Sequence, residues 1–208
     1  MNFYDEFARY SSDTTIVTEG YQQLSYKDLW VAADNISKHI KKRCLIFLLA
    51  ENSFESIVGY VGLLRANAAS VLINAGIKSS FFTKLLDAYK PAYIYLPNNK
   101  QLDISCSEVC SLGEYRLLQT AYHMDYILHD DLALLLTTSG STGSPKFVRQ
   151  SYKNINGNAQ SIAEYLEITS SDRPITTMPM SYTYGLSIIN SHLLQGASMV
   201  LTEATLLE

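Results

Sequence analysis

The sequence has few charged residues, one tryptophan and three cysteines among its 208 residues. Only 17% of the residues are charged, and the formal net charge of −4 argues against the basic surface that nucleic-acid binding needs. No apolar run reaches the roughly 20 residues of a membrane-spanning helix, and the N-terminus lacks the basic and apolar regions of a secretory signal. We therefore predict a cytoplasmic protein that has no membrane span and binds no nucleic acid.

The cysteines and histidines show no pattern of a disulfide framework or a metal site. Cys44 lies in an apolar run, where a buried and reduced thiol is the ordinary interpretation, while Cys106 and Cys110 would need further ligands nearby to bind a metal. The four histidines are scattered without the spacing of metal ligands. The sequence therefore predicts no metal ligands in this chain.

Apolar runs and helical spacings alternate along the chain, which is 47% hydrophobic. Ser25 and either Asn52 or Ser53 are candidate helix caps. The expected helices cover residues 3–10, 25–38, 53–67, 79–89, 151–166 and 186–195. The expected strands cover 15–19 and 22–25, which form a hairpin, then 44–49, 69–73, 92–96, parts of 109–119, 132–136, 147–150, 174–178 and 198–201. This alternation predicts an α/β fold with a mainly parallel sheet flanked by helices.

A loop rich in hydroxyl groups and glycine follows one of the predicted buried strands. The ten residues TTSGSTGSPK occupy positions 137–146, directly after LALLL at 132–136. Such a loop surrounds one concavity with backbone N–H groups, hydroxyls and a single ammonium, and each hydrogen bond to a phosphate oxygen contributes about 1.5 to 3 kcal/mol. Composition alone also fits an ordinary turn, but the order of the residues favours a polyphosphate-binding loop.

The loop differs from the common GxxxxGK[ST] phosphate-binding motif. Pro145 precedes Lys146, and Phe147 begins a predicted strand in place of a helix. Because proline has no N–H group and fixes its own φ, we expect a strand-to-strand connection in which no helix dipole faces the phosphates. The loop itself must then hold the anion.

Two motifs resemble those of the adenylate-forming (AMP-binding) enzymes, which include acyl-CoA and aryl-CoA ligases, nonribosomal-peptide adenylation domains and firefly luciferase. The first motif is the 137–146 loop, and the second is MPMSYTYGL at 178–186 followed by LLQGA at 193–197. The segment LSYKDL at 24–29 and residues 59–74 also resemble earlier parts of this family. The resemblance thus covers essentially the whole chain.

The resemblance implies that residues 1–208 are part of the large N-terminal domain of an adenylation enzyme. The family's adenine-binding segment, its ribose-binding Asp and its C-terminal lid domain with a catalytic Lys are not found before Glu208. We therefore expect the chain to be truncated before these parts and to be inactive alone. We also expect apolar surface at the truncated edge to support self-association.

The resemblance further implies the reaction and the residues that serve it. A small carboxylic acid attacks the α-phosphate of ATP, pyrophosphate leaves, and the acyl-adenylate passes to the thiol of CoA or of phosphopantetheine on an acyl carrier protein, with magnesium offsetting the phosphate charge. Lys146 and Tyr182 are the implied catalytic residues. The implied nucleotide-binding residues are Thr138, Ser139, Gly140, Ser141, Thr142, Gly143 and Lys146.

Tyr182 stands where many relatives carry His and where amino-acid-activating relatives carry Asp. A tyrosine fills space and donates one hydrogen bond, but it cannot pair with an α-ammonium group as a carboxylate does. We therefore expect a carboxylic acid without a free α-amino group as the substrate. Phe147 in place of a common Gly, and SYKN at 151–154 in place of Thr-His-x-Asn, indicate a divergent subfamily. The alternative function is a non-catalytic nucleotide-binding or structural module.

Overall fold

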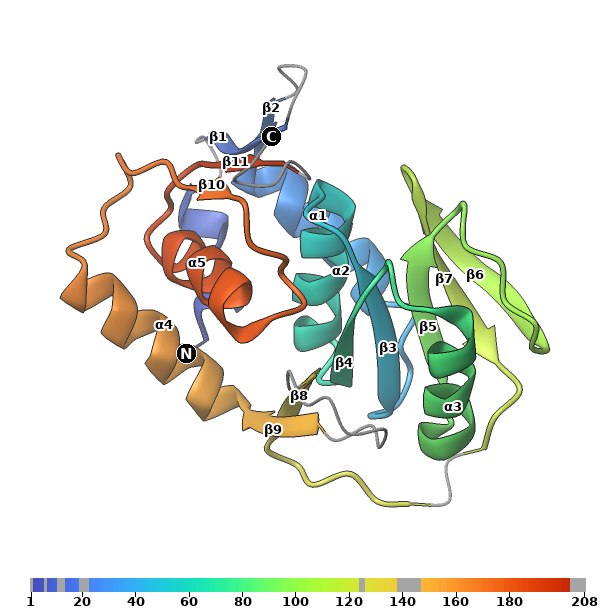
Figure 1. The fold of residues 1–208 in the computed structure, drawn as a ribbon. Coiled ribbons are helices and arrows are strands. Elements are labelled where there is room, and N and C mark those ends of the chain that lie inside the picture. The colour runs from blue at the N-terminus through green and yellow to red at the C-terminus, as the bar shows by residue number, and fades with distance from the viewer. Residues whose placement is uncertain are drawn as a thin grey trace.

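The computed structural model describes residues 2–5, 7–10, 14–18, 23–123, 126–137 and 147–202. Within these residues the strands form two sheets (Figure 1). The larger sheet has the order β6-β7-β5-β3-β4-β8-β9, and the smaller one has the order β10-β11-β1-β2.

The strands of the larger sheet are β3 (Leu45–Ala50), β4 (Ala69–Asn74), β5 (Tyr93–Pro97), β6 (Cys106–Leu112), β7 (Tyr115–Thr120), β8 (Leu132–Thr137) and β9 (Phe147–Ser151). Those of the smaller sheet are β1 (Thr14–Thr18), β2 (Gln23–Ser25), β10 (Ile175–Thr176) and β11 (Met199–Leu201). The helices are α1 (Tyr26–Ser37), α2 (Phe54–Arg65), α3 (Ser79–Tyr89), α4 (Tyr152–Tyr165) and α5 (Thr183–Leu194), preceded by the 3-10 turns η1 (Phe3–Asp5) and η2 (Phe7–Tyr10).

The predicted α/β fold with its largely parallel sheet is confirmed. The four central strands β5, β3, β4 and β8 are parallel, and the hairpin partners β7, β6 and β9 add antiparallel pairs at the two sides. The antiparallel pairing of β1 with β2 confirms the predicted N-terminal hairpin. Because parallel strands need long crossover connections, helices α2 and α3 lie between the central strands in the sequence.

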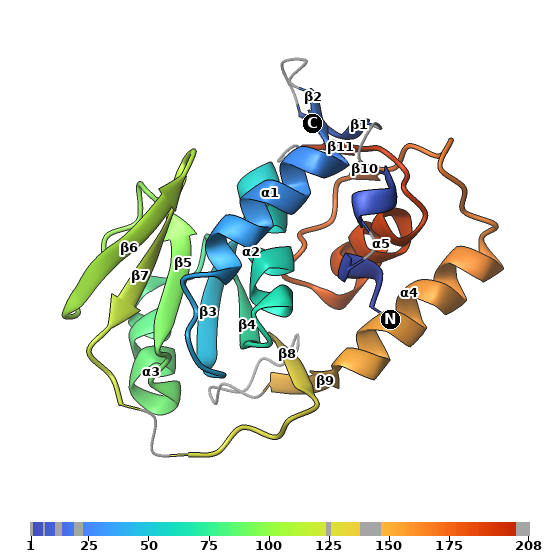
Figure 2. The same cartoon turned by 180° about the vertical axis from the view of Figure 1, so that it is seen from behind.

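The two faces of the larger sheet carry separate hydrophobic cores, because successive side chains of a strand point to opposite faces. Ile46 and Leu48 of β3 belong to the core formed with α1, α2 and α5. Phe47 and Leu49 belong to the core formed with α3. Figure 1 shows α3 in front of the sheet, and Figure 2 shows α1 in front when the molecule is turned by 180°. All four residues are fully or almost fully buried, as the apolar run 44–49 predicted.

Three serines begin helices by accepting a hydrogen bond from a backbone N–H group of the first turn. Ser25 caps α1 and forms a reciprocal capping box with Asp28, whose carboxylate accepts hydrogen bonds from the Ser25 hydroxyl and N–H; these bonds lower the pKa of Asp28. Ser53, not Asn52, caps α2. Ser151 caps α4 through the same arrangement with Asn154. The helix starts predicted near 25, 53 and 151 are confirmed.

Two sequence predictions of helices are wrong in detail. Within the predicted helix 3–10, the described residues 3–5 and 7–10 form 3-10 turns and not an α-helix, and Phe3 and Phe7 pack against the core. Helix α5 begins at Thr183, three residues before the predicted start at 186. Gly185 lies inside its first turn, where a Cβ atom would overlap the backbone carbonyl oxygen of Pro179. The glycine thus allows the first turn of α5 to pack closely against the backbone of the segment that precedes the helix.

Arg43 connects the start of β8 to the segment before β4 through hydrogen bonds. The Arg43 guanidinium donates hydrogen bonds to the carbonyl oxygen and side-chain oxygen of Asn67, at 2.6 and 3.0 Å, and to the carbonyl oxygens of His129 and Leu132, both at 2.6 Å. Next to it, burial raises the pKa of the Cys44 thiol to about 11, so this cysteine is a protonated core residue. Arg43 therefore fixes the segment that leads into β8.

Replacing Arg43 with Met is expected to destabilise the chain by about 2 to 4 kcal/mol, because four carbonyl or amide oxygens lose a charged donor. Urea unfolding followed by circular dichroism measures this change. The matched control is Lys42→Met at an exposed neighbouring position, where the change is expected to stay within about 0.5 kcal/mol. Equal stability of the two variants would contradict this role of Arg43.

Candidate functional site

The site assembles at the carboxyl edge of the parallel strands. In register, Ala50 of β3 pairs with Asn74 of β4, and Leu72 of β4 pairs with Leu136 of β8. The carboxyl ends of these three strands therefore lie side by side. In open α/β sheets this edge is the usual place for ligand binding.

The glycine-rich loop begins and ends at this edge. Thr137, the last residue of β8, pairs with Phe147, the first residue of β9, so the predicted strand-to-strand connection is confirmed. The Phe147 ring packs edge-on against Tyr89 of α3, with the ring centroids 5.0 Å apart. The loop residues named above, Thr138, Ser139, Gly140, Ser141, Thr142, Gly143 and Lys146, lie outside the described residues.

Tyr182 lies at the beginning of α5, at the N-cap position. Its backbone is extended, its side chain makes no capping hydrogen bond, and 43% of the residue is exposed. The Tyr182 carbonyl oxygen accepts the first helical hydrogen bond from the Leu186 N–H, while the preceding N–H groups of the first turn have no capping side chain. An uncapped helix N-terminus with an exposed tyrosine is compatible with a bound carboxylate or phosphate.

Asn52 joins the segment before α5 to the end of β3. Its side-chain nitrogen donates hydrogen bonds to the carbonyl oxygens of Thr176 (2.7 Å), Met178 (3.2 Å) and Thr202 (3.2 Å). Its side-chain oxygen accepts a hydrogen bond from the Met180 N–H at 3.0 Å. One amide therefore positions the residues that lead to Tyr182 relative to the edge of the large sheet. The sequence analysis considered Asn52 only as a helix cap and missed this role, because the partners are backbone atoms more than 120 residues away.

The buried hydroxyl of Tyr115 forms hydrogen bonds that hold the end of β3 in place. The Tyr115 hydroxyl donates to the Leu49 carbonyl oxygen (3.1 Å) and the Glu51 carboxylate (3.3 Å), and it accepts from the Ser56 hydroxyl (2.8 Å). Burial raises the pKa of Tyr115, so the phenol stays protonated and neutral. These bonds tie the end of β3 to the first turn of α2 and to β7.

A cavity of about 360 Å³ opens between α4 and α5 and is also lined by residues of β8 and β9. Its apolar residues are Leu134, Leu136, Ile155 and Leu186, and its polar residues are Gln150, Asn154, Asn158, Ser161, Thr183, Ser187 and Asn190, together with Gly157. Thr183 adjoins Tyr182, and Leu136 is one residue before the end of β8. The cavity therefore lies between Tyr182 and the base of the glycine-rich loop.

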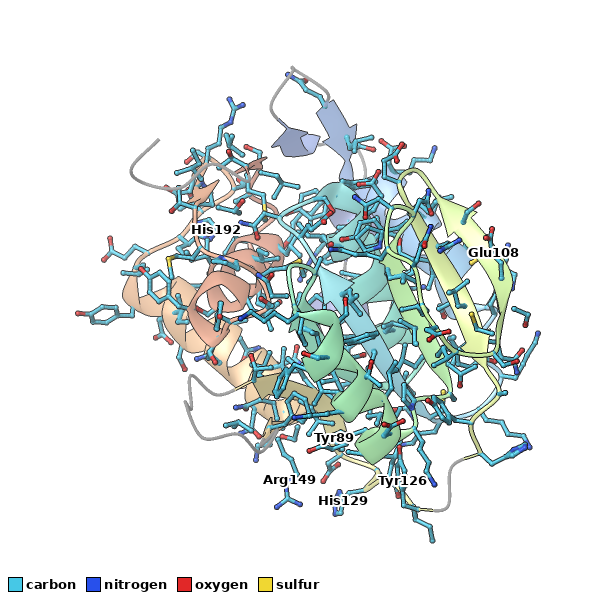
Figure 3. All side chains as sticks on the ribbon, turned by 45° about the vertical axis from the view of Figure 1, so that its right-hand side comes forward. Tyr89, Glu108, Tyr126, His129, Arg149 and His192 are labelled. Atoms are coloured by element: carbon cyan, nitrogen blue, oxygen red, sulfur yellow. The ribbon has the colours of Figure 1, made fainter. Side chains whose placement is uncertain are left out.

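Other polar groups belong to a neighbouring hollow or to the helix surface. His129 and Arg149 border a different hollow next to the start of β8, and Figure 3 shows Arg149 pointing away from the sheet. His192 of α5 bonds through Nδ1 with the Ile188 carbonyl oxygen at 2.8 Å. Within the described ranges no three His, Cys, Asp or Glu side chains gather as metal ligands do, and no described helix is both long and apolar enough to span a bilayer.

The arrangement is that of the N-terminal domain of adenylate-forming enzymes. Apo MatB from Rhodopseudomonas palustris has the same fold, with a TM-score of 0.77 and 21% identity; the match covers 97% of this chain and 45% of MatB. The chain belongs to the AMP-binding enzyme family, since the family model matches residues 3–207. The family resemblance predicted from the two motifs is thereby confirmed.

Two curated relatives represent different branches of this family. Bacitracin synthase 1 of Bacillus licheniformis is 25% identical over 210 residues, which cover 96% of this chain and 4% of the synthase. The 2-succinylbenzoate–CoA ligase of Bacillus velezensis is 26% identical over 192 residues, which cover 86% of this chain and 39% of the ligase. The chain spans less than half the length of these proteins.

Replacing Asn52 with Ala is expected to lower the free energy of unfolding by about 2 to 4 kcal/mol, because three carbonyl oxygens and one N–H lose their common partner. Amide hydrogen exchange is expected to accelerate at Met180 and Tyr182. Asn98→Ala is the matched control, since the Asn98 side chain donates one exposed hydrogen bond, to the Gly113 carbonyl oxygen. If exchange at Met180 were unchanged in Asn52→Ala, the amide would not position this segment.

Proposed function

We propose that this chain is the N-terminal part of an adenylation domain that activates a carboxylic acid with ATP. A carboxylate oxygen of the acid attacks the α-phosphorus, the bond from that phosphorus to the bridging oxygen breaks, and pyrophosphate leaves with the electron pair. The product is a mixed acyl–AMP anhydride. The observation that carries this proposal is that one cavity is lined by Thr183, next to Tyr182, and by Leu136, next to Thr137 at which the loop begins, in a chain of the AMP-binding family.

The loop 138–146 is proposed to bind the β- and γ-phosphates. Glycines at 140 and 143 allow close approach of the backbone, hydroxyls at 138, 139, 141 and 142 contact phosphate oxygens, and Lys146 supplies a positive charge. The pairing of Thr137 with Phe147 supports this proposal, because it brings the two ends of the loop together at the ligand-binding edge. Positioning and charge neutralisation are the main demands of this chemistry.

Tyr182 and the first turn of α5 are proposed to face the reacting carboxylate. The exposed phenol is a hydrogen-bond donor, and the N–H groups at the start of a helix whose N-cap side chain makes no capping hydrogen bond favour a negative charge. Neither group carries a formal charge that would bind an α-ammonium. The cavity beside Thr183 is then proposed to hold the rest of the acid.

Magnesium is proposed to arrive with ATP, held by the phosphate oxygens. No cluster of acidic or histidine ligands lies within the described part of the chain, so these residues supply no metal cage of their own. The acyl acceptor is proposed to be a thiol, either of CoA or of phosphopantetheine on a carrier protein. The two curated relatives, a peptide synthase and a CoA ligase, are compatible with either acceptor.

The competing function is a nucleotide-binding or structural module without catalysis. Both functions explain a phosphate-binding loop, but only an enzyme needs an acid-binding cavity next to it. The cavity between α4 and α5 therefore favours the enzyme.

Carboxylate-dependent ATP–pyrophosphate exchange tests the enzyme proposal in the full-length natural protein that contains these residues. Lys146→Ala is expected to slow the exchange by about 10- to 100-fold, because one charge that stabilises the transition state is removed. Lys153→Ala is the control, since Lys153 is exposed on α4, and it is expected to change the rate less than twofold. ATP binding without exchange for any carboxylic acid would favour the non-catalytic module.

The absence of a carboxylate at position 182 predicts a preference against α-amino acids. In the same assay butanoate is expected to support faster exchange than 2-aminobutanoate, because the α-ammonium of the latter finds no negative partner at Tyr182. Tyr182→Asp is expected to reduce the ratio of the exchange rate with butanoate to that with 2-aminobutanoate. Faster exchange with the amino acid in the unaltered protein would disprove the assignment.

A further inference from the structure

The cavity between α4 and α5 has an uncharged but polar lining. Seven of its lining residues carry an amide or a hydroxyl group, and no lining residue carries a charge. A charged group placed there would lose its hydration without gaining an ion-pair partner, which is unfavourable. A purely alkyl group would in turn cover polar atoms that need hydrogen bonds. The lining therefore fits a neutral ligand that forms hydrogen bonds.

Asn190 is the most deeply buried polar residue of this lining. It is 4% exposed, and its side-chain oxygen is buried without a hydrogen-bond partner among the described residues. Tyr60 of α2 is also completely buried. Burial raises the pKa of Tyr60, and a side-chain hydrogen bond with Asn190 lowers it in part. The Asn190 side-chain oxygen is thus a buried acceptor in the wall of the cavity that the described residues leave unsatisfied.

A glycine in the middle of α4 keeps the opposite wall open. A Cβ atom added at Gly157 would meet no other atom within 4 Å. By contrast, Gly59 and Gly62 of α2 allow close contact with Tyr95 and with the backbone of Ala33. A glycine inside a helix costs about 1 kcal/mol relative to alanine, and at Gly157 no packing contact accounts for it. The open space that it leaves belongs to the cavity.

We propose that this cavity selects a carboxylic acid whose chain carries a neutral hydrogen-bonding group, a hydroxyl or a carboxamide, and that Asn190 determines this specificity. The inference rests on the proposed adenylation function, because it places the carboxylate of the acid at Tyr182. From there the chain of the acid passes Thr183 and Ser187, one turn apart on α5, and reaches Asn190 on the next turn. Side chains at these spacings lie on one face of the helix.

The test compares three acids of equal size in the full-length natural protein. Pentanoate, 4-hydroxybutanoate and 4-aminobutanoate end in a methyl, a hydroxyl and an ammonium group. We expect kcat/KM for pyrophosphate exchange to be highest with 4-hydroxybutanoate and lowest with 4-aminobutanoate. Asn190→Leu preserves the branched shape and the number of non-hydrogen atoms of the side chain, and it is expected to lower kcat/KM for the hydroxy acid about tenfold, with little change for pentanoate.

A second variant keeps the test valid if Asn190→Leu folds poorly. Gly157→Leu places a side chain in the open space and improves the helix propensity of α4. It is expected to raise the KM for the acid at least tenfold, while leaving the KM for ATP unchanged and the unfolding temperature equal to or above that of the unaltered protein. Gly157→Ala, which adds one carbon atom, serves as the matched control and is expected to have a small effect on the KM for the acid.

The outcomes distinguish this inference from the adenylation function. Calorimetric titration with 4-hydroxybutanoate in the absence of ATP measures binding separately from exchange. If the acid binds and Asn190→Leu weakens binding but no acid supports exchange, the cavity assignment holds and the adenylation function fails. If exchange occurs equally well with all three acids, or if neither Asn190→Leu nor Gly157→Leu alters it, the function holds and the proposed specificity is overturned.

Discussion

The parallel pairing of β3, β4 and β8 is the constraint on which the site depends. Parallel strands end at the same edge of a sheet, so the chain leaving β3 and the chain leaving β8 emerge next to each other although more than 80 residues separate them. Asn52 follows β3, and the glycine-rich loop follows β8. Helices α2 and α3 complete the crossovers and bury both faces of the central strands, which holds this edge rigid.

Side-chain amides and hydroxyls then attach the second structural unit to this edge. Strands β10 and β11 of the small sheet and helix α5 come from the C-terminal part of the chain. Asn52 donates hydrogen bonds to the carbonyl oxygens of Thr176, Met178 and Thr202 in this part. The Tyr115 hydroxyl, from β7, also holds the end of β3 by donating a hydrogen bond to the Leu49 carbonyl oxygen. Because each of these bonds satisfies a backbone group that has limited access to water, the arrangement is specific in its geometry. The position of Tyr182 follows from it.

The cavity has a different origin, since it comes from the packing of α4 against α5 and not from the edge of the sheet. A polar wall, a buried amide oxygen without a partner among the described residues and a helix glycine without a packing contact occur together there. Each of these features alone has a small energetic cost. Their coincidence in one cavity beside the first turn of α5 is what connects them to a bound acid.

The sequence by itself determined the order of elements, most helix starts and the family. Ser25, Ser53 and Ser151 predict helix starts, and the apolar run at 132–136 predicts a buried strand. Helix caps and apolar runs can be recognised from a few adjacent residues, because they depend on local hydrogen bonds and local composition. The two family motifs, at 137–146 and 178–186, are likewise recognised from adjacent residues. The placement of the phosphate-binding residues themselves stays a prediction, since they lie outside the described part of the chain.

Only the tertiary structure decided which distant residues meet. Nothing near Asn52 in the sequence shows that it binds a segment 124 to 150 residues away. Asn190 and Gly157 read as ordinary helix residues until α4 and α5 are packed together. The close approach of Gly185 in α5 to the backbone of Pro179 became visible in the same way. The physical reason is the same in each case: these roles rest on non-local contacts and burial, which exist after the chain has folded and leave no periodic pattern in the sequence.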